Sequence, residues 1–226
     1  MNTPTPIDFP NNTVIEILGN VASGKTTVSL NIPKVSNFHY VDIDIYAQNP
    51  FLSDYVKDSK RWTFTSDLFF SFERAKQISI VKEAMEQNPV VLDSGFNMGM
   101  AVYTRSCFHQ NKLNPEEWAF FQTLHTNLMK DAPPLYASIF IEAPIEILMA
   151  RIKKRGRLHE QNYTKEYLLQ LQEGLDEYKE NLLTNKSRNI IMTYHELEKT
   201  YVFDRGNDPK ITNVLKKLEE ILSLEG

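Results

Sequence analysis

Two glycines and a lysine stand at a spacing that suits phosphate binding. They lie in the run Gly-Asn-Val-Ala-Ser-Gly-Lys-Thr-Thr at 19–27, which follows the apolar run 14–18 and leads into a helical pattern. Glycines let successive backbone N–H groups point inward at a helix N-terminus, which favours an anion. The lysine can then reach the β- and γ-phosphates of a nucleotide, and the first threonine hydroxyl can bind Mg²⁺. The residues predicted to bind a nucleoside triphosphate are Gly19, Asn20, Val21, Ala22, Ser23, Gly24, Lys25, Thr26 and Thr27.

Carboxylates at strand ends supply a second kind of chemistry. Asp93 follows three apolar residues, as a Walker B acid does, and would bind Mg²⁺ directly or through water. Burying such a carboxylate without a partner would be costly. Asp42 and Asp44 end another strand-like run on one face. Either could take the proton of an attacking hydroxyl, or both could be a solvated strand end.

A basic cluster occupies residues 151–157, with Glu160 shortly after it. Cationic residues at a helix end often form only a solvated face that complements the helix dipole. Gly156, however, separates Arg155 from Arg157 and predicts a loop that can fold over phosphates. Such a lid, at about 151–163, would supply guanidinium charge and exclude water.

Asp67 and Arg74 are seven residues apart in a long helical segment. This spacing places them on one face, about 10 Å apart along the axis. They could contact the polar edge of a ligand. They could equally form the polar stripe of an amphipathic helix, and on periodicity alone this second interpretation is favoured. The aromatic residues nearby, such as Phe70, are core residues by the same pattern.

The elements that must position these residues alternate along the chain. Strand patterns occupy residues 13–18, 38–44, 89–93, 136–142 and 188–194, and helical patterns occupy 60–87, 114–130, 144–154, 164–183 and 209–222. Alternation of this kind predicts an α/β fold with a parallel sheet covered on both faces. No linker divides the chain, so we predict one domain over 13–226 after a flexible lead-in of residues 1–12.

Composition narrows the class of protein. The chain has 226 residues, a formal net charge of −4 and one cysteine, Cys107. The slight acidic balance argues against a nucleic-acid partner. The single cysteine excludes an intrachain disulfide and favours a reducing compartment. No apolar run is long enough to span a membrane, and no signal sequence is evident. We therefore expect a cytoplasmic protein without a membrane partner.

Taken in order, these motifs resemble the deoxynucleoside kinases, in the branch of the bacterial deoxyadenosine and deoxyguanosine kinases. The resemblance covers about residues 14–178. Besides the phosphate loop it rests on 49–52 (Asn-Pro-Phe-Leu), 61–64 (Arg-Trp-Thr-Phe) with Phe69, Phe70 and Arg74 beyond it, 90–93, and the lid run 151–160. The lid run is the most diagnostic part because generic phosphate-loop proteins lack it.

The resemblance implies a P-loop nucleoside triphosphate hydrolase/kinase fold with a five-stranded parallel sheet and an arginine lid. It also implies a homodimer that uses ATP and Mg²⁺ and transfers the γ-phosphate to the 5′-hydroxyl of a deoxynucleoside. The general base would be Asp44, with Asp42 as the alternative. The lid arginines would be Arg155 and Arg157, with Arg151 behind them. The residues implied for the nucleoside are Asp67, Arg74, Glu160, Tyr55 and Phe70.

Three departures from the family pattern concern the nucleoside. Ser94 stands where the family has an arginine after the Walker B acid, and Arg105 is the candidate substitute. Val56 stands at the position of a family tyrosine, with Tyr55 one residue out of register. Asp67 replaces the glutamine that reads the base.

The acid at position 67 bears on which base is bound. An ionised carboxylate only accepts hydrogen bonds, which suits guanine N1–H and N2–H₂ or cytosine N4–H₂. A wrong base would leave buried polar groups unpaired. The sequence therefore favours a purine deoxynucleoside, deoxyguanosine before deoxyadenosine.

Two other functions remain open from the sequence. A nucleoside monophosphate kinase of the thymidylate kinase type would need basic residues for the acceptor phosphate, and Lys57, Lys60 and Arg61 are the candidates. A kinase-fold protein that binds nucleotide without catalysis is kept open by the residues Ser94 and Val56.

Overall fold

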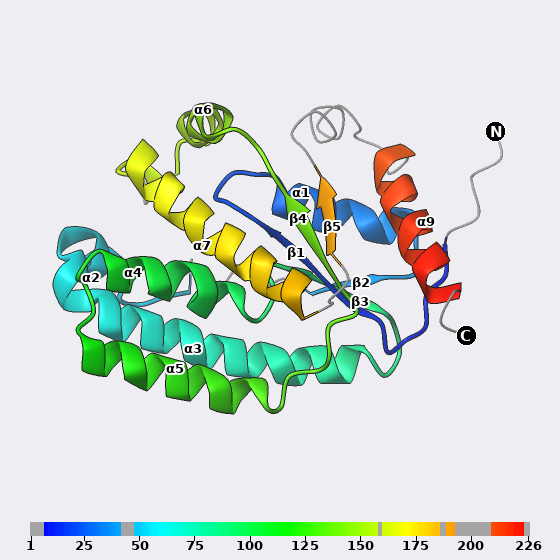
Figure 1. Cartoon of the computed structure of the whole chain (residues 1–226), viewed down its shortest axis with the longest axis horizontal. Coiled ribbons are helices and arrows are strands. Elements are labelled where there is room, and N and C mark those ends of the chain that lie inside the picture. The colour runs from blue at the N-terminus through cyan, green and yellow to red at the C-terminus, as the bar shows by residue number, and fades with distance from the viewer. Residues whose placement is uncertain (1–6, 42–47, 158–159, 186–188, 193–208, 224–226) are drawn as a thin grey trace.

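The computed structural model describes residues 7–41, 48–157, 160–185, 189–192 and 209–223. A parallel sheet forms its centre, with strand order β2-β3-β1-β4-β5 (Figure 1). The strands are β1 (Val14–Gly19), β2 (His39–Val41), β3 (Val90–Asp93), β4 (Ala137–Ile141) and β5 (Asn189–Met192). The central strand β1 pairs in parallel with both β3 and β4. This order places the carboxyl ends of β1 and β3 side by side. The phosphate loop follows β1, and Asp93 is the last residue of β3.

Helices cover both faces of the sheet (Figure 1). On one face, α1 (Lys25–Asn31) and α9 (Pro209–Ser223) pack against the odd-numbered residues of β1, Ile15 and Ile17. On the other, α3 (Ser59–Ala84), α6 (Ile145–Arg155) and α7 (Lys165–Thr184) meet Val14 and Leu18. Helix α5 (Pro115–Met129) packs on α3. This arrangement confirms the predicted α/β class with a parallel sheet flanked by helices.

Helices cover both faces of strand β1, and its residues are apolar except for Glu16 and the terminal Gly19. Glu16 is fully buried between Ile15 and Ile17. It points to the face that carries α3 and α7, since side chains alternate along a strand. A strand of a parallel sheet that is buried on both sides is expected to be a continuous apolar run. The glutamate therefore needs a partner from the tertiary structure.

The predicted long helices are found, with ends that shift by a few residues. Several short elements are not in the sequence interpretation. These are α2 (Leu52–Lys57), the 3₁₀ turn η1 (Ile32–Lys34), the π-helical turn η2 (Gly99–Thr104) and α4 (Arg105–His109). Short helices bury too few residues to impose a clear period on the sequence. They matter here because η2 and α4 pack against α7.

The predicted flexible lead-in over residues 1–12 contacts the core in the part that the structure describes, from residue 7 onward. Phe9 is buried and its ring packs on Phe38 at 4.9 Å between centroids. The side chain of Asn37 bonds both the N–H and the C=O of Phe9. Ile7 pairs with Ser36 as an isolated parallel bridge. Ile7 and Phe9 thus belong to the same hydrophobic cluster as the buried residues of α9.

Among the described residues, none of the helices combines the length and the apolar character that a membrane crossing requires.

Candidate active site

The phosphate loop has a backbone that only glycine permits. Gly19 and Gly24 have φ values of 152° and 113°. A Cβ on Gly19 would lie 2.6 Å from both the carbonyl oxygen of Ile141 and the Oγ of Ser23. The ammonium of Lys25 curls back and donates to the carbonyl oxygens of Gly19 (2.9 Å) and Asn20 (3.0 Å). The loop therefore forms a concave turn at the N-terminus of α1, with its lysine held over it, as a triphosphate site requires.

Two neighbouring helices brace this loop. Asn20 donates through Nδ2 to the carbonyl oxygen of Leu168 in α7 at 2.8 Å. Arg151 of α6 donates to the carbonyl oxygens of Ala22 (3.2 Å) and Ser23 (2.9 Å). The Arg151 guanidinium thus supports the backbone of the loop that is predicted to bind phosphate.

Thr26 and Asp93 form the oxygen pair that a magnesium ion needs. The Thr26 hydroxyl donates to Oδ2 of Asp93 at 2.5 Å. Asp93 ends β3, which pairs with β1 at Ile17. The described residues contain no group of three or more His, Cys, Asp or Glu side chains placed to hold a metal. Mg²⁺ bound with nucleotide uses one or two protein oxygens together with phosphate oxygens, so Thr26 and Asp93 fit it.

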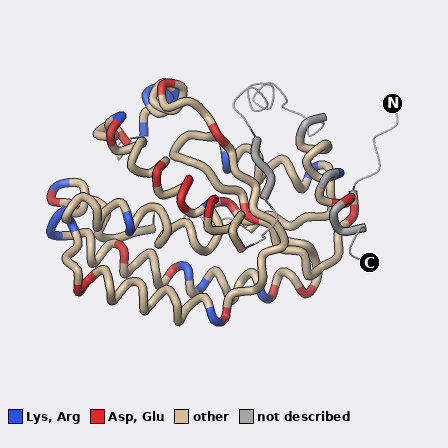
Figure 2. The backbone as a smooth tube through the Cα atoms, in the orientation of Figure 1, with Lys and Arg blue, Asp and Glu red and all other residues tan. Residues whose placement is uncertain are grey.

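The predicted lid begins where α6 ends. Gly156 takes a left-handed conformation with φ of 63°, which stops the helix after Arg155. Arg155 makes a two-point ion pair with Glu160, with Nε to Oε2 at 2.5 Å. Arg157 lies 3.9 Å from the same carboxylate. Basic residues therefore gather at the end of α6 (Figure 2), where buried Glu160 neutralises them in part.

The electrostatics of Lys25 link the loop, the metal pair and the lid. Burial lowers the pKa of Lys25, and Asp93 acts against that effect. The charges of Arg155 and Glu160 also act on this pKa, in opposite directions. The structure therefore brings together five predicted residues from four separate segments: Lys25, Thr26, Asp93, Arg155 and Glu160.

Asp67 and Arg74 both turn toward the protein interior, so the interpretation as an exposed polar stripe is wrong. Asp67 is buried, and desolvation raises the pKa of its carboxyl group to about 7 although Thr104 donates a hydrogen bond. Its Oδ2 has no partner among the described residues. Arg74 donates through Nη1 to the carbonyl oxygen of Gly95, while its buried Nε has no partner there. Two buried polar atoms on α3 thus lack a hydrogen-bond partner among the described residues.

Tyrosines surround this part of α3. The Tyr55 hydroxyl bonds the thiol of Cys107, whose pKa is raised to about 12, chiefly by burial. Tyr55 and Tyr103 both act electrostatically on Tyr167 of α7. Val56, in contrast, is 44 % exposed. The inward tyrosine is therefore Tyr55, the residue one position out of register in the sequence.

The remaining predicted residues have the following contacts and positions. Phe70 packs edge-on to Phe69, with ring centroids 5.9 Å apart. Arg105 forms an ion pair with Glu177 of α7. It is Arg74 that reaches the backbone just after Ser94. Thr27 lies in the first turn of α1.

The two candidates predicted for the general base, Asp42 and Asp44, lie outside the described residues, because both fall in 42–47. The structure therefore leaves the choice between them open.

Sequence reasoning missed Glu16. Its carboxyl group is buried in β1, where it accepts hydrogen bonds from Ser138 (2.6 Å) and Tyr178 (3.2 Å). Burial raises its pKa to about 7, although both donors and the charge of Arg74 act against this. The available signal was one charged residue inside an otherwise apolar strand.

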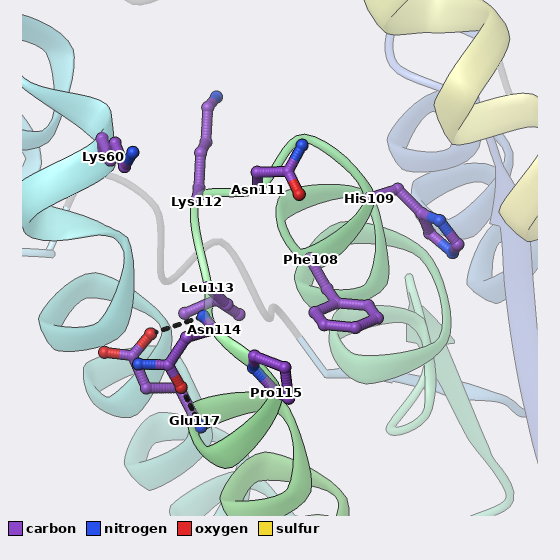
Figure 3. A pocket seen from close by; sticks show the side chains of 9 residues that line it. All are labelled: Lys60, Phe108, His109, Asn111, Lys112, Leu113, Asn114, Pro115 and Glu117. Atoms are coloured by element: carbon purple, nitrogen blue, oxygen red, sulfur yellow. Dashed lines mark hydrogen bonds between the residues drawn. The ribbon is translucent and has the colours of Figure 1, made fainter.

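A separate cavity of about 680 Å³ opens between the start of α3, the end of α4 and the start of α5 (Figure 3). Lys60 and Lys112 stand at its mouth, and Asn114 and Glu117 cap α5 below them. Its lining contains no residue of the phosphate loop or the lid. Of the basic residues that a monophosphate kinase would need, Lys57 pairs with Asp54 and Arg61 lies over the Trp62 ring.

Comparison with known proteins agrees with this geometry. The sequence model of the deoxynucleoside kinase family matches residues 15–220. The chain belongs to the deoxynucleoside kinase family. The family predicted from the sequence is therefore confirmed, and with it an ATP-dependent deoxynucleoside kinase.

The relatives are distant but span nearly the whole chain. A deoxyguanosine kinase of Bacillus subtilis is 25 % identical over 206 residues, which cover 90 % of this chain and 96 % of that protein. A deoxyadenosine kinase of Lactobacillus acidophilus is 26 % identical over 220 residues, covering 92 % and 96 %. The fold matches a structure of deoxyadenosine kinase from M. mycoides with bound dCTP. That match has a TM-score of 0.75 and 19 % identity, and it covers 92 % of this chain and 100 % of the other.

Proposed function

We propose that this deoxynucleoside kinase transfers the γ-phosphate of ATP to the 5′-hydroxyl of a purine deoxynucleoside, deoxyguanosine in the first place. One observation carries the proposal. The loop with Lys25, Thr26 and Asp93 lies at the ends of β1 and β3, and the chain that follows Asp93 runs directly to Gly95, which Arg74 contacts. A triphosphate site and a buried polar site thus share one short segment.

At the donor end, defined as residues 19–27 with Asp93 and Arg155, the chain binds the triphosphate. The loop N–H groups and Lys25 would hold the β- and γ-phosphates. Thr26 and Asp93 would hold Mg²⁺, which neutralises charge on the phosphate oxygens when it is bound. Arg155 and Arg157 form the proposed arginine lid and would stabilise the transferring phosphoryl group. For this, Arg155 must give up part of its pairing with Glu160.

At the acceptor end, defined as Asp67, Arg74 and the residues they contact, the chain binds the nucleoside. Oδ2 of Asp67 would accept hydrogen bonds from guanine N1–H and N2–H₂, and Nε of Arg74 would donate to an acceptor atom of the base. Tyr55 and Glu160 would bind the sugar hydroxyl, and Phe70 would contribute an apolar wall. Asp44 would take the proton of the 5′-hydroxyl, with Asp42 as the alternative.

The name of the Bacillus subtilis relative supports deoxyguanosine, since that protein is a deoxyguanosine kinase. The buried Oδ2 of Asp67, which has no partner within the described residues, supports the same base. A base that lacks the matching donors would leave this carboxylate desolvated and unpaired, which is costly.

We also propose that the protein is a cytoplasmic homodimer. Phe72 and Ile80 of α3 are 65 % and 52 % exposed, and Phe120 of the adjacent α5 is 45 % exposed. A second copy laid against α3 and α5 would cover these apolar side chains. Light scattering during gel filtration would give about twice the mass of one chain, and Phe72→Glu should return it to the monomer mass.

The substrate proposal is tested by incubating the protein with ATP, Mg²⁺ and each of the four natural deoxynucleosides. Deoxyguanosine should give its 5′-monophosphate with the highest kcat/KM. Deoxynucleoside monophosphates should give no product. Folded protein that phosphorylates none of the four would overturn the proposal, and a pyrimidine preference would overturn its base assignment.

A further inference from the structure

Glu16 is a fully buried charged residue in the central strand of the sheet. Its neighbours in the register are Leu92 of β3 and Ser138 of β4, so it has a paired strand on each side. Burying a carboxylate costs several kcal/mol unless its oxygens are paired. The contacts of its two oxygens show what the residue does.

One oxygen, Oε1, is held by a chain of hydrogen bonds. Ser138 and Tyr178 both donate to it. Asn97 donates to the hydroxyl of Tyr178 at 3.0 Å, and His125 of α5 bonds Oδ1 of Asn97 at 2.9 Å. These contacts come from β4, α7, α5 and the segment after β3, so they fix the orientation of the carboxylate.

The other oxygen, Oε2, lies against Gly95 and has no partner among the described residues. A Cβ on Gly95 would stand only 1.8 Å from it, so the carboxylate fills the space that a side chain would take. Ser94 and Gly95 have positive φ values of 75° and 54°. The turn after the Walker B strand is thus shaped around Glu16.

Arg74 contacts the same glycine. Its Nη1 donates to the carbonyl oxygen of Gly95, and a Cβ on Gly99 would lie 3.1 Å from its Nε. Burial lowers the pKa of Arg74, whereas the carboxylates of Glu16 and Asp93 act to raise it. The guanidinium is therefore held by backbone and by nearby negative charge, and its Nε has no hydrogen-bond partner in the part of the chain that the structure describes.

We propose that Glu16 is a positioning residue of the acceptor end. Its negative charge and its packing against Gly95 hold the guanidinium of Arg74 in place, so that the Nε–H of Arg74 stays available to the nucleobase. In water-excluded surroundings such a charge fixes a neighbouring guanidinium strongly. Gly95 and Gly99 leave the space that this arrangement needs. The role toward the nucleobase rests on the proposed function.

Kinetics of Glu16→Gln test the proposal, because glutamine keeps the shape and removes the charge. The KM for deoxyguanosine should rise about tenfold or more, while the KM for ATP stays within about twofold. Glu16→Asp, which keeps the charge at a shorter reach, should restore part of the loss. Lys34→Ala is the control, since this lysine is exposed at the end of η1, and it should leave both KM values within about twofold.

A second measurement does not depend on turnover. In ¹H–¹⁵N spectra of the arginine side chains, the Nε–H signal of Arg74, assigned with Arg74→Lys, should exchange slowly with water. Glu16→Gln should speed this exchange, and Lys34→Ala should leave it unchanged.

The two measurements separate the possible failures. If the unmodified protein phosphorylates no deoxynucleoside, the proposed function fails, and the exchange rates still decide whether Glu16 holds Arg74. Equal exchange rates in the unmodified and Glu16→Gln proteins would overturn the positioning role. An equal rise of both KM values would also overturn it, because a general loss of structure affects both substrates.

Discussion

The donor end and the acceptor end both contain buried or half-buried charges, yet they satisfy them differently. At the donor end, Lys25 donates to two carbonyl groups, Thr26 to Asp93, and Arg155 to Glu160. At the acceptor end, one polar atom each of Asp67, Arg74 and Glu16 is buried without a partner among the described residues. The donor end thus pairs its charged groups within the protein, and its one such unpartnered atom among the described residues is the neutral hydroxyl of Ser23. The acceptor end leaves atoms of its charged groups without a partner among those residues.

This difference matches the chemistry of the two substrates. A triphosphate brings its own charge and metal ion, so the donor groups can exchange their internal partners for phosphate oxygens without being left unpaired. A neutral nucleobase offers only a few donors and acceptors at fixed positions. Buried polar groups of the protein that are already in position for these atoms give selectivity, because a mismatched base leaves the protein groups unpaired. We infer that the groups of the donor end determine the rate of phosphoryl transfer and that the groups of the acceptor end determine which deoxynucleoside is selected.

The largest expected effect is at the donor end. Lys25→Ala should lower kcat by about 10²-fold to 10³-fold for every deoxynucleoside, because it removes a charge that stabilises the phosphoryl group in transfer. Steady-state assays with ATP check this. Lys34→Ala, an exposed lysine at the end of the next turn, is the control and should keep full activity. If Lys25→Ala changed the order of kcat/KM among the deoxynucleosides, the donor end would also determine selectivity, which contradicts this inference.

The next effect is at the acceptor end. Asp67→Asn should lower kcat/KM for deoxyguanosine by about 10²-fold and improve deoxyadenosine relative to it, because an amide both donates and accepts hydrogen bonds, as adenine requires. The KM for ATP should not change. Competition between the two nucleosides in one reaction measures the ratio directly. An unchanged ratio would mean that Asp67 does not read the base.

The third prediction concerns stability rather than activity, because stability should depend on pH through the acceptor end. The pKa values of Glu16 and Asp67 are both raised to about 7 by burial. The folded state then binds protons more tightly than the unfolded state, so this stabilisation is complete below the unfolded pKa values and is lost as pH rises through 7. The free energy of unfolding should fall between pH 5 and pH 8 by up to about 3 kcal/mol per group.

Urea unfolding at the two pH values measures this. Glu16→Gln should flatten the dependence and be at least as stable as the unmodified protein at pH 8. A variant less stable at pH 8 would mean that Arg74 compensates the carboxylate by more than its burial costs. The Lys34→Ala protein should show the full pH dependence.

Much of the fold could be predicted because its signals are local. The glycine spacing around Lys25 and the apolar run that ends in Asp93 each lie within one short segment, and the structure places both as expected. The long helices have clear periods. The short helix α2 has no clear period, so register with the family put Val56 at the tyrosine position, whereas Tyr55, the residue named for the site, is the one that turns inward. The order of residues 7–9 depends on Asn37, far along the chain, and had no local signal.

The sequence by itself determined the phosphate loop, the order of strands and helices along the chain, and the family. These follow from patterns that one segment carries alone. Only the tertiary structure decided that Asp67 and Arg74 face inward, that Arg155 pairs with Glu160, and that Glu16 and Arg74 meet at Gly95. Burial and charge contacts depend on how the elements pack against one another, so no spacing along the chain can reveal them.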